Sequence, residues 1–166
     1  VKVAKKKLNQ INSGTNVKSY KLKVNQKNFQ NLIKKYDYVV DGSDNFKTKF
    51  LINDICLKKK KYLVTGAISK FDGHIFTFDN KNKKNPCIRC FFQETELSED
   101  ILNCEFDGIL GTVAGIIGTI QANEVLKNIL SIGRNLSGLI LVIDLLNLDF
   151  RKVKFNKRKE CICNHI

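Results

Sequence analysis

Residues 36–66 read YDYVVDGSDNFKTKFLINDICLKKKKYLVTG, and this stretch decides the fold. Its first part, 36–41, is a short apolar run of the kind that forms a buried parallel strand. Residues 45–58 follow with an amphipathic helical pattern, and 62–66 are a second short apolar run. Because short connections join two strands through a helix, the stretch predicts a βαβ unit. We therefore expect an α/β fold with a mostly parallel sheet and flanking helices.

The N-terminal side of this stretch adds shorter elements. The spacing of residues 2–11 and 28–35 predicts two helices, and the alternation of residues 17–24 (VKSYKLKV) predicts a strand. Neither a repeat nor a low-complexity linker interrupts the chain, so residues 1–166 are interpreted as a single domain.

The pattern changes after Gly66. Residues 70–80 alternate apolar and polar side chains like an exposed antiparallel strand, and residues 108–130 have the length and spacing of a long helix. Glycines in the first half of that helix lower its intrinsic stability, so we expect them to allow close packing against other backbone. Residues 139–144 and 150–155 predict a final pair of antiparallel strands.

The formal net charge of +13 raises the question of nucleic acid binding. Only four of the 29 basic residues are arginine, whereas proteins that read base edges favour the planar Arg fork. The lysine runs are therefore interpreted as solvated faces, and we expect no nucleic acid partner. Because no apolar stretch reaches the roughly 18 residues that a membrane helix needs, we also expect no membrane association.

Six cysteines without a secretory signal indicate thiols or metal ligands in a reducing compartment, and hence a cytoplasmic protein. Cys87-x-x-Cys90 and Cys161-x-Cys163 form two pairs, and such pairs let their sulfurs converge on one Zn²⁺. Four thiolates leave no open coordination position, so this zinc would be structural. Two alternatives stay open: His165 replaces a C-terminal cysteine that cannot reach, or the pairs are free buried thiols.

A polar turn follows the first strand of the βαβ unit and carries Asp41, Asp44 and Asn45. In open α/β sheets, ligands bind at the carboxyl ends of the strands. A carboxylate at that place can coordinate the Mg²⁺ of a nucleoside triphosphate. Asp and Asn are also ordinary turn residues, so the motif alone leaves a purely structural turn open.

Three further side chains need the right surroundings to carry chemistry. Cys104 lies in a polar segment before the long helix, where the helix N-terminus can lower the pKa of an exposed thiol, although a lone cysteine is more often inert. Cys56 falls on the apolar side of its helix and is assigned to the core. His74 has no Ser and Asp pattern around it that would indicate a catalytic triad.

Four segments carry a family resemblance: VVDGSDNFKTKFLINDIC (39–56), YLVTGAISKFDGHIFTFD (62–79), NPCIRCFF (85–92) and NCEFDGILGTVAGIIGTIQANEVLKNIL (103–130). Together they resemble the E1-like superfamily of ThiF, MoeB and HesA. The resemblance covers nearly all of the chain, and its specific part is the long helix together with the cysteine pairs. It implies the Rossmann-like fold of these proteins, with C-terminal antiparallel strands.

The resemblance also implies an activity. Members of the superfamily use ATP and Mg²⁺ to adenylate the C-terminal Gly-Gly of a ubiquitin-like sulfur carrier of the ThiS or MoaD type, and release pyrophosphate. A sulfur donor such as a cysteine desulfurase then leads to a thiocarboxylate. Between the thiamine and molybdopterin pathways we favour thiamine. Zn²⁺ as a structural metal and a homodimer are further implications.

The motif match assigns roles to individual residues. Asp44 matches the catalytic residue that binds Mg²⁺, and Cys104 matches the cysteine that can take a covalent sulfur-linked carrier. Asn45, Lys49 and Asn53 lie on the helix that faces the nucleotide and are assigned a supporting role in binding it. The structural zinc ligands of the family match Cys87, Cys90, Cys161 and Cys163.

The sequence departs from the family pattern in two respects. The Gly-rich phosphate loop and the ATP-contacting Lys of the family belong upstream of Val1, so we interpret 1–166 as one E1-like domain that is incomplete at its N-terminus. We therefore expect that this chain alone cannot adenylate. The second cysteine pair of the family is normally C-x-x-C, one residue longer than Cys161-Ile-Cys163. The alternative is a non-catalytic zinc-containing remnant that only binds the carrier protein.

Overall fold

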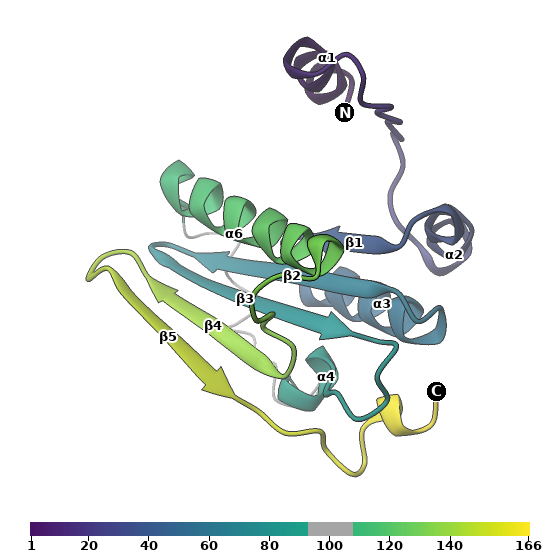
Figure 1. Ribbon diagram of the computed structural model, residues 1–166, viewed down its shortest axis with the longest axis vertical. Coiled ribbons are helices and arrows are strands. Elements are labelled where there is room, and N and C mark those ends of the chain that lie inside the picture. The colour runs from purple at the N-terminus through teal and green to yellow at the C-terminus, as the bar shows by residue number, and fades with distance from the viewer. Residues whose placement is uncertain (93–107) are drawn as a thin grey trace.

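A five-stranded sheet forms the centre of the computed structural model, which describes residues 1–92 and 108–166. The strands lie in the order β1-β2-β3-β4-β5 (Figure 1). Their bounds are β1 Tyr38–Asp41, β2 Tyr62–Ser69, β3 Asp72–Asp79, β4 Leu139–Asp144 and β5 Asp149–Lys154. The predicted α/β class and the C-terminal antiparallel strands are confirmed.

The share of parallel pairing is smaller than expected. Within the described residues only β1 and β2 pair in parallel, and the other three strand pairs are antiparallel. The cause is local, because residues 70–71 connect Ser69 directly to its partner Asp72. A two-residue connection permits only an antiparallel pair, whereas a parallel pair needs a crossover.

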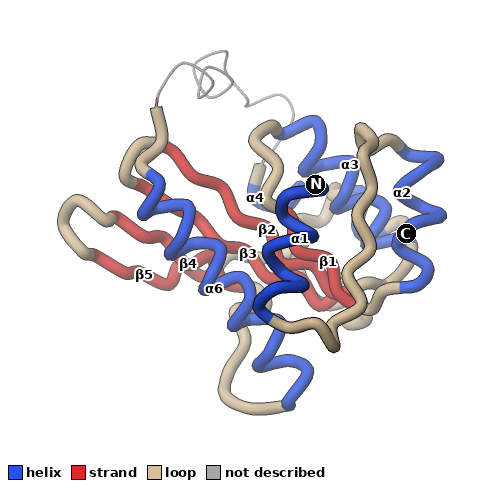
Figure 2. The backbone as a smooth tube through the Cα atoms, turned by 90° about the horizontal axis from the view of Figure 1, so that it is seen from above, coloured by secondary structure: helices blue, strands red, loops and turns tan. Residues whose placement is uncertain are grey.

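Helices cover both faces of the sheet (Figure 2). Their bounds are α1 Lys2–Ile11, α2 Gln26–Leu32 with a 3-10 turn at Ile33–Lys35, α3 Phe46–Lys58, α4 Ile88–Phe91, α6 Gly111–Leu130 and a 3-10 turn at Ile162–Asn164. No helix in the described ranges is both long and apolar enough to cross a membrane.

Strand alternation divides the core in two. On one face, Leu63, Phe76 and Phe78 pack with side chains of α3. On the other face, Ile75 packs against Ile117 of α6. Successive strand residues point to opposite faces, so helices on both sides are needed to bury the two sets.

Two expectations about individual segments are wrong. Residues 17–24 form no strand: the alternating segment is mostly exposed and pairs with none of the described strands. β3 is antiparallel as expected but is largely buried rather than exposed, because α6 covers its second face.

The glycines of α6 also differ from expectation. A Cβ built at Gly111, Gly115 or Gly118 would have no described atom outside its own helix within 4 Å. The close approach lies on the sheet instead, where a Cβ at Gly73 of β3 would be 2.2 Å from Cδ1 of Ile117.

Helix α1 lies apart from the rest of the molecule. It buries none of its residues, and an extended segment separates it from the sheet (Figure 1). The elements that position the candidate site are therefore β1, β2, β3, α3 and α6.

Candidate functional site

A cavity of about 620 Å³ opens at the carboxyl ends of β1 and β2. It is lined by the turn 42–45, the first turn of α3, the end of β2 and the N-terminal half of α6. This is the edge at which open α/β sheets bind ligands. Two hollows of about 470 and 670 Å³ beside α1 have no acidic side chain in their walls, and so offer no carboxylate to a metal.

Asp44 lies exposed at the wall of this cavity, in the place that its sequence position predicted. Asn45 donates a hydrogen bond from Nδ2 to Oδ1 of Asp44 at 2.9 Å, and this bond lowers the pKa of the Asp44 carboxyl. Oδ1 of Asn45 accepts from the main-chain N–H of Thr48 at 2.8 Å and caps α3. Asp44 is thus an ionised, accessible carboxylate on a fixed turn, as a Mg²⁺ ligand must be.

Lys49 lines the same cavity but is only 5% exposed. Its ammonium lies 3.3 Å from Oδ2 of the buried Asp41 and 2.6 Å from the main-chain oxygen of Gly66. Burial lowers the pKa of Lys49, and the carboxylate of Asp41 opposes that shift. The sequence places Lys49 on the helix that faces the nucleotide, but it does not predict the ion pair between Lys49 and Asp41.

Asn53 does not line the cavity. It is fully buried, donates from Nδ2 to Oδ1 of Asp54 at 3.0 Å and accepts the main-chain N–H of Ile88 at 3.3 Å. Arg89 continues the same contact, with Nε 2.8 Å from Oδ1 of Asp54. Asn53 therefore joins α3 to α4, and its amide is occupied within the protein.

Helix α6 carries two buried polar residues to which the sequence motif assigns no role, and of these only Gln121 lines the cavity. Gln121 donates from Nε2 to the main-chain oxygen of Asp41 at 2.9 Å. Glu124 accepts the main-chain N–H of Leu136 at 2.9 Å and pairs with Lys127. Gln and Glu three residues apart on the buried stripe of an otherwise apolar helix are the signal that could have identified them.

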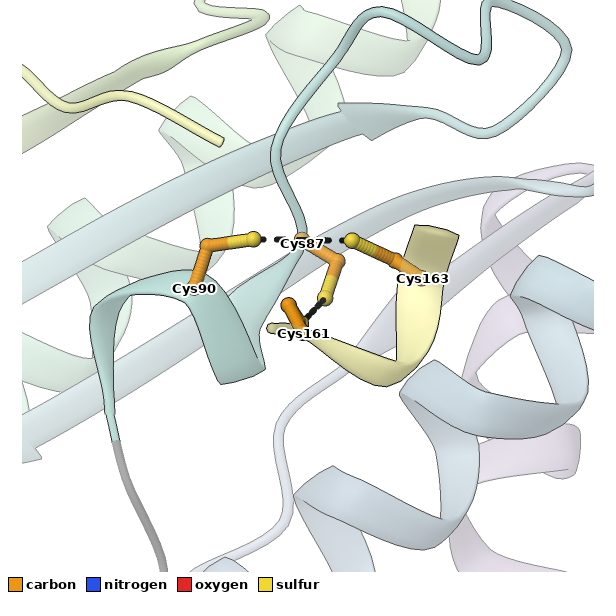
Figure 3. Close-up of side chains that lie close together, drawn as sticks. All are labelled: Cys87, Cys90, Cys161 and Cys163. Carbon is orange, nitrogen blue, oxygen red and sulfur yellow. Dashed lines mark hydrogen bonds between the residues drawn. The ribbon is translucent and has the colours of Figure 1, made fainter. Parts of the chain in front are cut away.

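The two cysteine pairs converge into one cluster (Figure 3). All four thiols are buried, and their sulfur atoms lie within 4.8 Å of one another. The sulfur of Cys87 is 3.6 Å from that of Cys161, and the sulfur of Cys90 is 3.5 Å from that of Cys163. Zn–S bonds of about 2.3 Å in a tetrahedron place sulfurs about 3.8 Å apart, so the cluster fits Zn²⁺. The shorter C-x-C spacing does not prevent convergence, and His165 is not needed.

Protons are shared unevenly in this cluster. A hydrogen bond from Cys87 lowers the pKa of Cys90 to about 4. Burial raises the pKa of Cys163 to about 12. A cation that bound all four sulfurs would have to displace the protons that the thiols hold.

The other cysteines and the histidine are distributed as follows. Cys56 is in the core as predicted, and burial raises its pKa to about 12, which makes it unreactive. Cys104 lies outside the described residues. His74 is half-buried at the floor of the cavity, a position that sequence reasoning did not assign to it.

Comparison with known proteins places this arrangement in a family. The family model described as "ThiF family" matches residues 1–164, nearly the whole chain. The chain belongs to the ThiF family.

Named relatives agree with this membership. The chain is 38% identical over 160 residues to the "Probable molybdopterin-synthase adenylyltransferase" of Pyropia yezoensis, covering 96% of this chain and 42% of that protein. It is 35% identical over 162 residues to the "Sulfur carrier protein adenylyltransferase" of Thermus thermophilus, covering 96% and 60%. This ThiF-family chain thus spans less than two thirds of these relatives.

Solved structures support the fold. The crystal structure of E. coli MccB with SeMet MccA matches with a TM-score of 0.79, 16% sequence identity, and coverage of 98% of this chain and 49% of that one. At this identity the likeness shows the fold alone, and it confirms the E1-like architecture expected for a ThiF-family chain.

Proposed function

We propose that the protein carrying this chain is an ATP-dependent adenylyltransferase that activates the C-terminal Gly-Gly of a ubiquitin-like sulfur carrier of the ThiS or MoaD type. The observation that carries the proposal is Asp44, an accessible carboxylate beside a cavity at the carboxyl ends of β1 and β2. Membership of the ThiF family and the names of the two relatives support the same reaction class. Whether the carrier serves thiamine or molybdopterin synthesis is the finer part of the proposal.

The proposed reaction converts a poor electrophile into a good one. A carboxylate oxygen of the carrier attacks the α-phosphorus of ATP, an oxygen–phosphorus bond forms, and the bond to pyrophosphate breaks. The acyl group of the product then bears AMP as its leaving group. Mg²⁺, bound with ATP, would offset the charge that the phosphates carry. Asp44 would hold this ion at the mouth of the cavity, and Asn45 would fix the carboxylate that does so.

The cysteine cluster has a separate role in this proposal. Cys87 and Cys90 flank α4, while Cys161 and Cys163 belong to the C-terminal tail, so a shared Zn²⁺ would fasten the tail to the middle of the chain. Four sulfur ligands complete the coordination of the ion and leave no position for substrate. The zinc would be structural and would take no part in adenylation.

Several partners belong to the proposal on the strength of the family resemblance. They are a sulfur donor such as a cysteine desulfurase and a second copy of the chain as a homodimer. A cytoplasmic location is also proposed, and the six cysteines support it. Cys104 is proposed as the residue that takes a sulfur-linked carrier. The phosphate loop is proposed to be supplied by residues outside 1–166, so that the 166 residues alone would not adenylate.

The test is carrier-dependent exchange of labelled pyrophosphate into ATP, catalysed by the protein purified from its own cells, whose intact mass is measured first. We expect exchange that requires a carrier ending in Gly-Gly. Asp44→Asn should lower it by about 10²-fold or more, whereas Asp149→Asn, on the exposed strand β5, should leave it unchanged.

Other outcomes would count against the proposal. Carrier binding without exchange by the native protein would favour the non-catalytic remnant. Exchange that persists in Asp44→Asn would remove Asp44 from the reaction. Exchange by residues 1–166 alone would show that no further phosphate-binding segment is needed.

A further inference from the structure

The turn that presents Asp44 is built on the carboxylate of Asp41. Asp41 ends β1 and is buried. Its Oδ1 accepts the main-chain N–H of Ser43 at 2.8 Å, which is the hydrogen bond of an Asx turn. Asp44 is the next residue, so the place of its carboxylate follows from the orientation of the Asp41 side chain.

The second carboxylate oxygen of Asp41 is equally occupied. Oδ2 accepts the hydroxyl of Thr65 at 2.6 Å and lies 3.3 Å from Nζ of Lys49. Thr65 belongs to β2 and Lys49 to α3. Asp41 therefore cannot rotate without breaking contacts to two neighbouring elements.

The ammonium of Lys49 has no donor left for a ligand. A lysine ammonium has three protons. Three acceptors surround Nζ: Oδ2 of Asp41 at 3.3 Å, the hydroxyl of Thr65 at 3.4 Å and the main-chain oxygen of Gly66 at 2.6 Å. A phosphate could contact Lys49 only by displacing one of these buried partners.

A continuous series of contacts connects Asp41 to Asp44 through Lys49 and Asn45. Lys49 donates its main-chain N–H to the main-chain oxygen of Asn45 at 3.1 Å, one helical turn earlier, while its side chain returns to Asp41. Asn45 in turn caps α3 and holds Oδ1 of Asp44. Asp41 thus holds the start of the 42–45 turn, and the N-terminus of α3 holds its end. The Asp41–Lys49 ion pair connects these two anchoring points.

The burial of this pair also needs an explanation. A buried ion pair is often no more stabilising than apolar residues of the same volume, because removing two charges from water is costly. Its demonstrated use in other proteins is to specify one arrangement of the chain. Here the arrangement that it specifies is the turn beside the cavity.

We propose that Lys49 and Asp41 are positioning residues: their buried ion pair fixes the turn that carries Asp44, and Lys49 does not itself bind the nucleotide. This inference rests on the proposed function. The sequence position of Lys49 predicts a role in binding the nucleotide. The inference instead assigns Lys49 the role of positioning the carboxylate of Asp44, which would bind the metal.

The test measures pyrophosphate exchange by the native protein as a function of Mg²⁺ concentration. Lys49→Met should raise the Mg²⁺ concentration for half-maximal exchange by about tenfold or more, the effect of one lost hydrogen bond to a charged group, with a smaller effect on the KM for ATP. Lys49→Arg keeps the charge and should restore most of the Mg²⁺ response. Asp41→Asn with Lys49→Met removes both charges, so its loss should be smaller than the product of the two single losses.

A matched control separates positioning from general loss of stability. Glu124 is a buried charged residue on α6 that does not line the cavity. Glu124→Gln removes this charge and should lower stability without changing the Mg²⁺ response. Hydrogen exchange at the amide of Ser43 gives a readout independent of activity. It should be faster in Lys49→Met and unchanged in Glu124→Gln.

The outcomes are distinguishable. A native protein without exchange overturns the proposed function, and the positioning role falls with it. A native protein that is active, with Lys49→Met showing the native Mg²⁺ response, overturns the positioning role alone. A rise in the KM for ATP with no change in the Mg²⁺ response would make Lys49 a nucleotide ligand after all.

Discussion

Gln121 donates a hydrogen bond from Nε2 to the main-chain oxygen of Asp41 at 2.9 Å, across 80 residues of sequence. The same nitrogen lies 3.4 Å from the main-chain oxygen of Val64. One side chain of α6 therefore satisfies carbonyl groups near the carboxyl ends of both parallel strands. The carboxamide can occupy this place because the neighbouring residue of β2, Gly66, has no side chain.

The first prediction follows from that contact. A Cβ at Gly66 would lie 2.9 Å from Cδ of Gln121, so Gly66→Ala should displace the carboxamide and lower the free energy of unfolding by about 1–3 kcal/mol. Gly115→Ala on α6 is the control, since its Cβ would meet no described atom outside its own helix, and it should raise stability by up to about 1 kcal/mol. Urea unfolding measures both. Equal effects of the two substitutions would contradict the proposed contact.

A second prediction concerns the cysteine cluster. The purified protein should contain one Zn²⁺ per chain, and Cys163→Ser should lose it together with at least about 3 kcal/mol of stability, because metal binding contributes directly to folding. Cys56→Ser changes a cysteine that is also buried but lies outside the cluster. It should lower stability while the zinc content stays the same. A zinc content near zero in the native protein would contradict the metal site.

The part of the fold that was predictable is the part with local causes. Residues 36–66 carry both strands and the helix of the βαβ unit, and each follows from its own pattern. Asp44 could be placed beside a cavity because the end of a parallel strand is a local feature. The convergence of the two cysteine pairs could be predicted from the residue type and from the family resemblance.

The predictions for β3 and for residues 17–24 were wrong because contacts with segments distant in the sequence decide whether a segment is buried or paired. Alternation along β3 indicated an exposed face, yet Gly73 and Thr77 are buried by Ile117 and Glu124 of α6, about 45 residues later. Residues 17–24 have a strand pattern, but they pair with none of the described strands, although β1 lies at the edge of the sheet. Periodicity shows that a segment can form a strand, but not whether a partner is available.

The role of Lys49 was missed for a related reason. Its place on α3 was evident from the sequence, and so was its direction toward the strand ends. What the ammonium contacts depends on Asp41 of β1 and on Thr65 and Gly66 of β2, and the fold brings these two strands to α3. No spacing rule in a single sequence contains that geometry.

A third prediction concerns pH. Burial lowers the pKa of His74, whereas the imidazole of the unfolded chain takes up its proton near the ordinary pKa of 6.5. Below that pH the unfolded state therefore binds more protons than the folded state, and stability falls as the pH falls. The contribution is complete above pH 6.5. Between pH 8 and pH 5 the native protein should lose more unfolding free energy than His74→Gln; equal losses would contradict the burial of the imidazole.

The last prediction tests the link between α3 and α4. Nε and Nη2 of Arg89 donate to the two carboxylate oxygens of Asp54 at 2.8 and 2.9 Å, and the guanidinium lies 4.4 Å from the ring centre of Phe50. Arg89→Lys keeps the charge but cannot form this fork, so it should cost about 1–3 kcal/mol. Since Arg89 lies between Cys87 and Cys90, a chelator should also remove zinc faster from the variant.

Arg151→Lys is the matched control, because Arg151 is exposed on β5 and far in sequence from α4. It should change neither the unfolding free energy beyond about 0.5 kcal/mol nor the rate of zinc release. If Arg89→Lys lowered stability while zinc release kept the native rate, α4 would be held by its cysteines alone. Faster release with unchanged stability would mean instead that the fork acts on the metal site and adds nothing to the packing of α3.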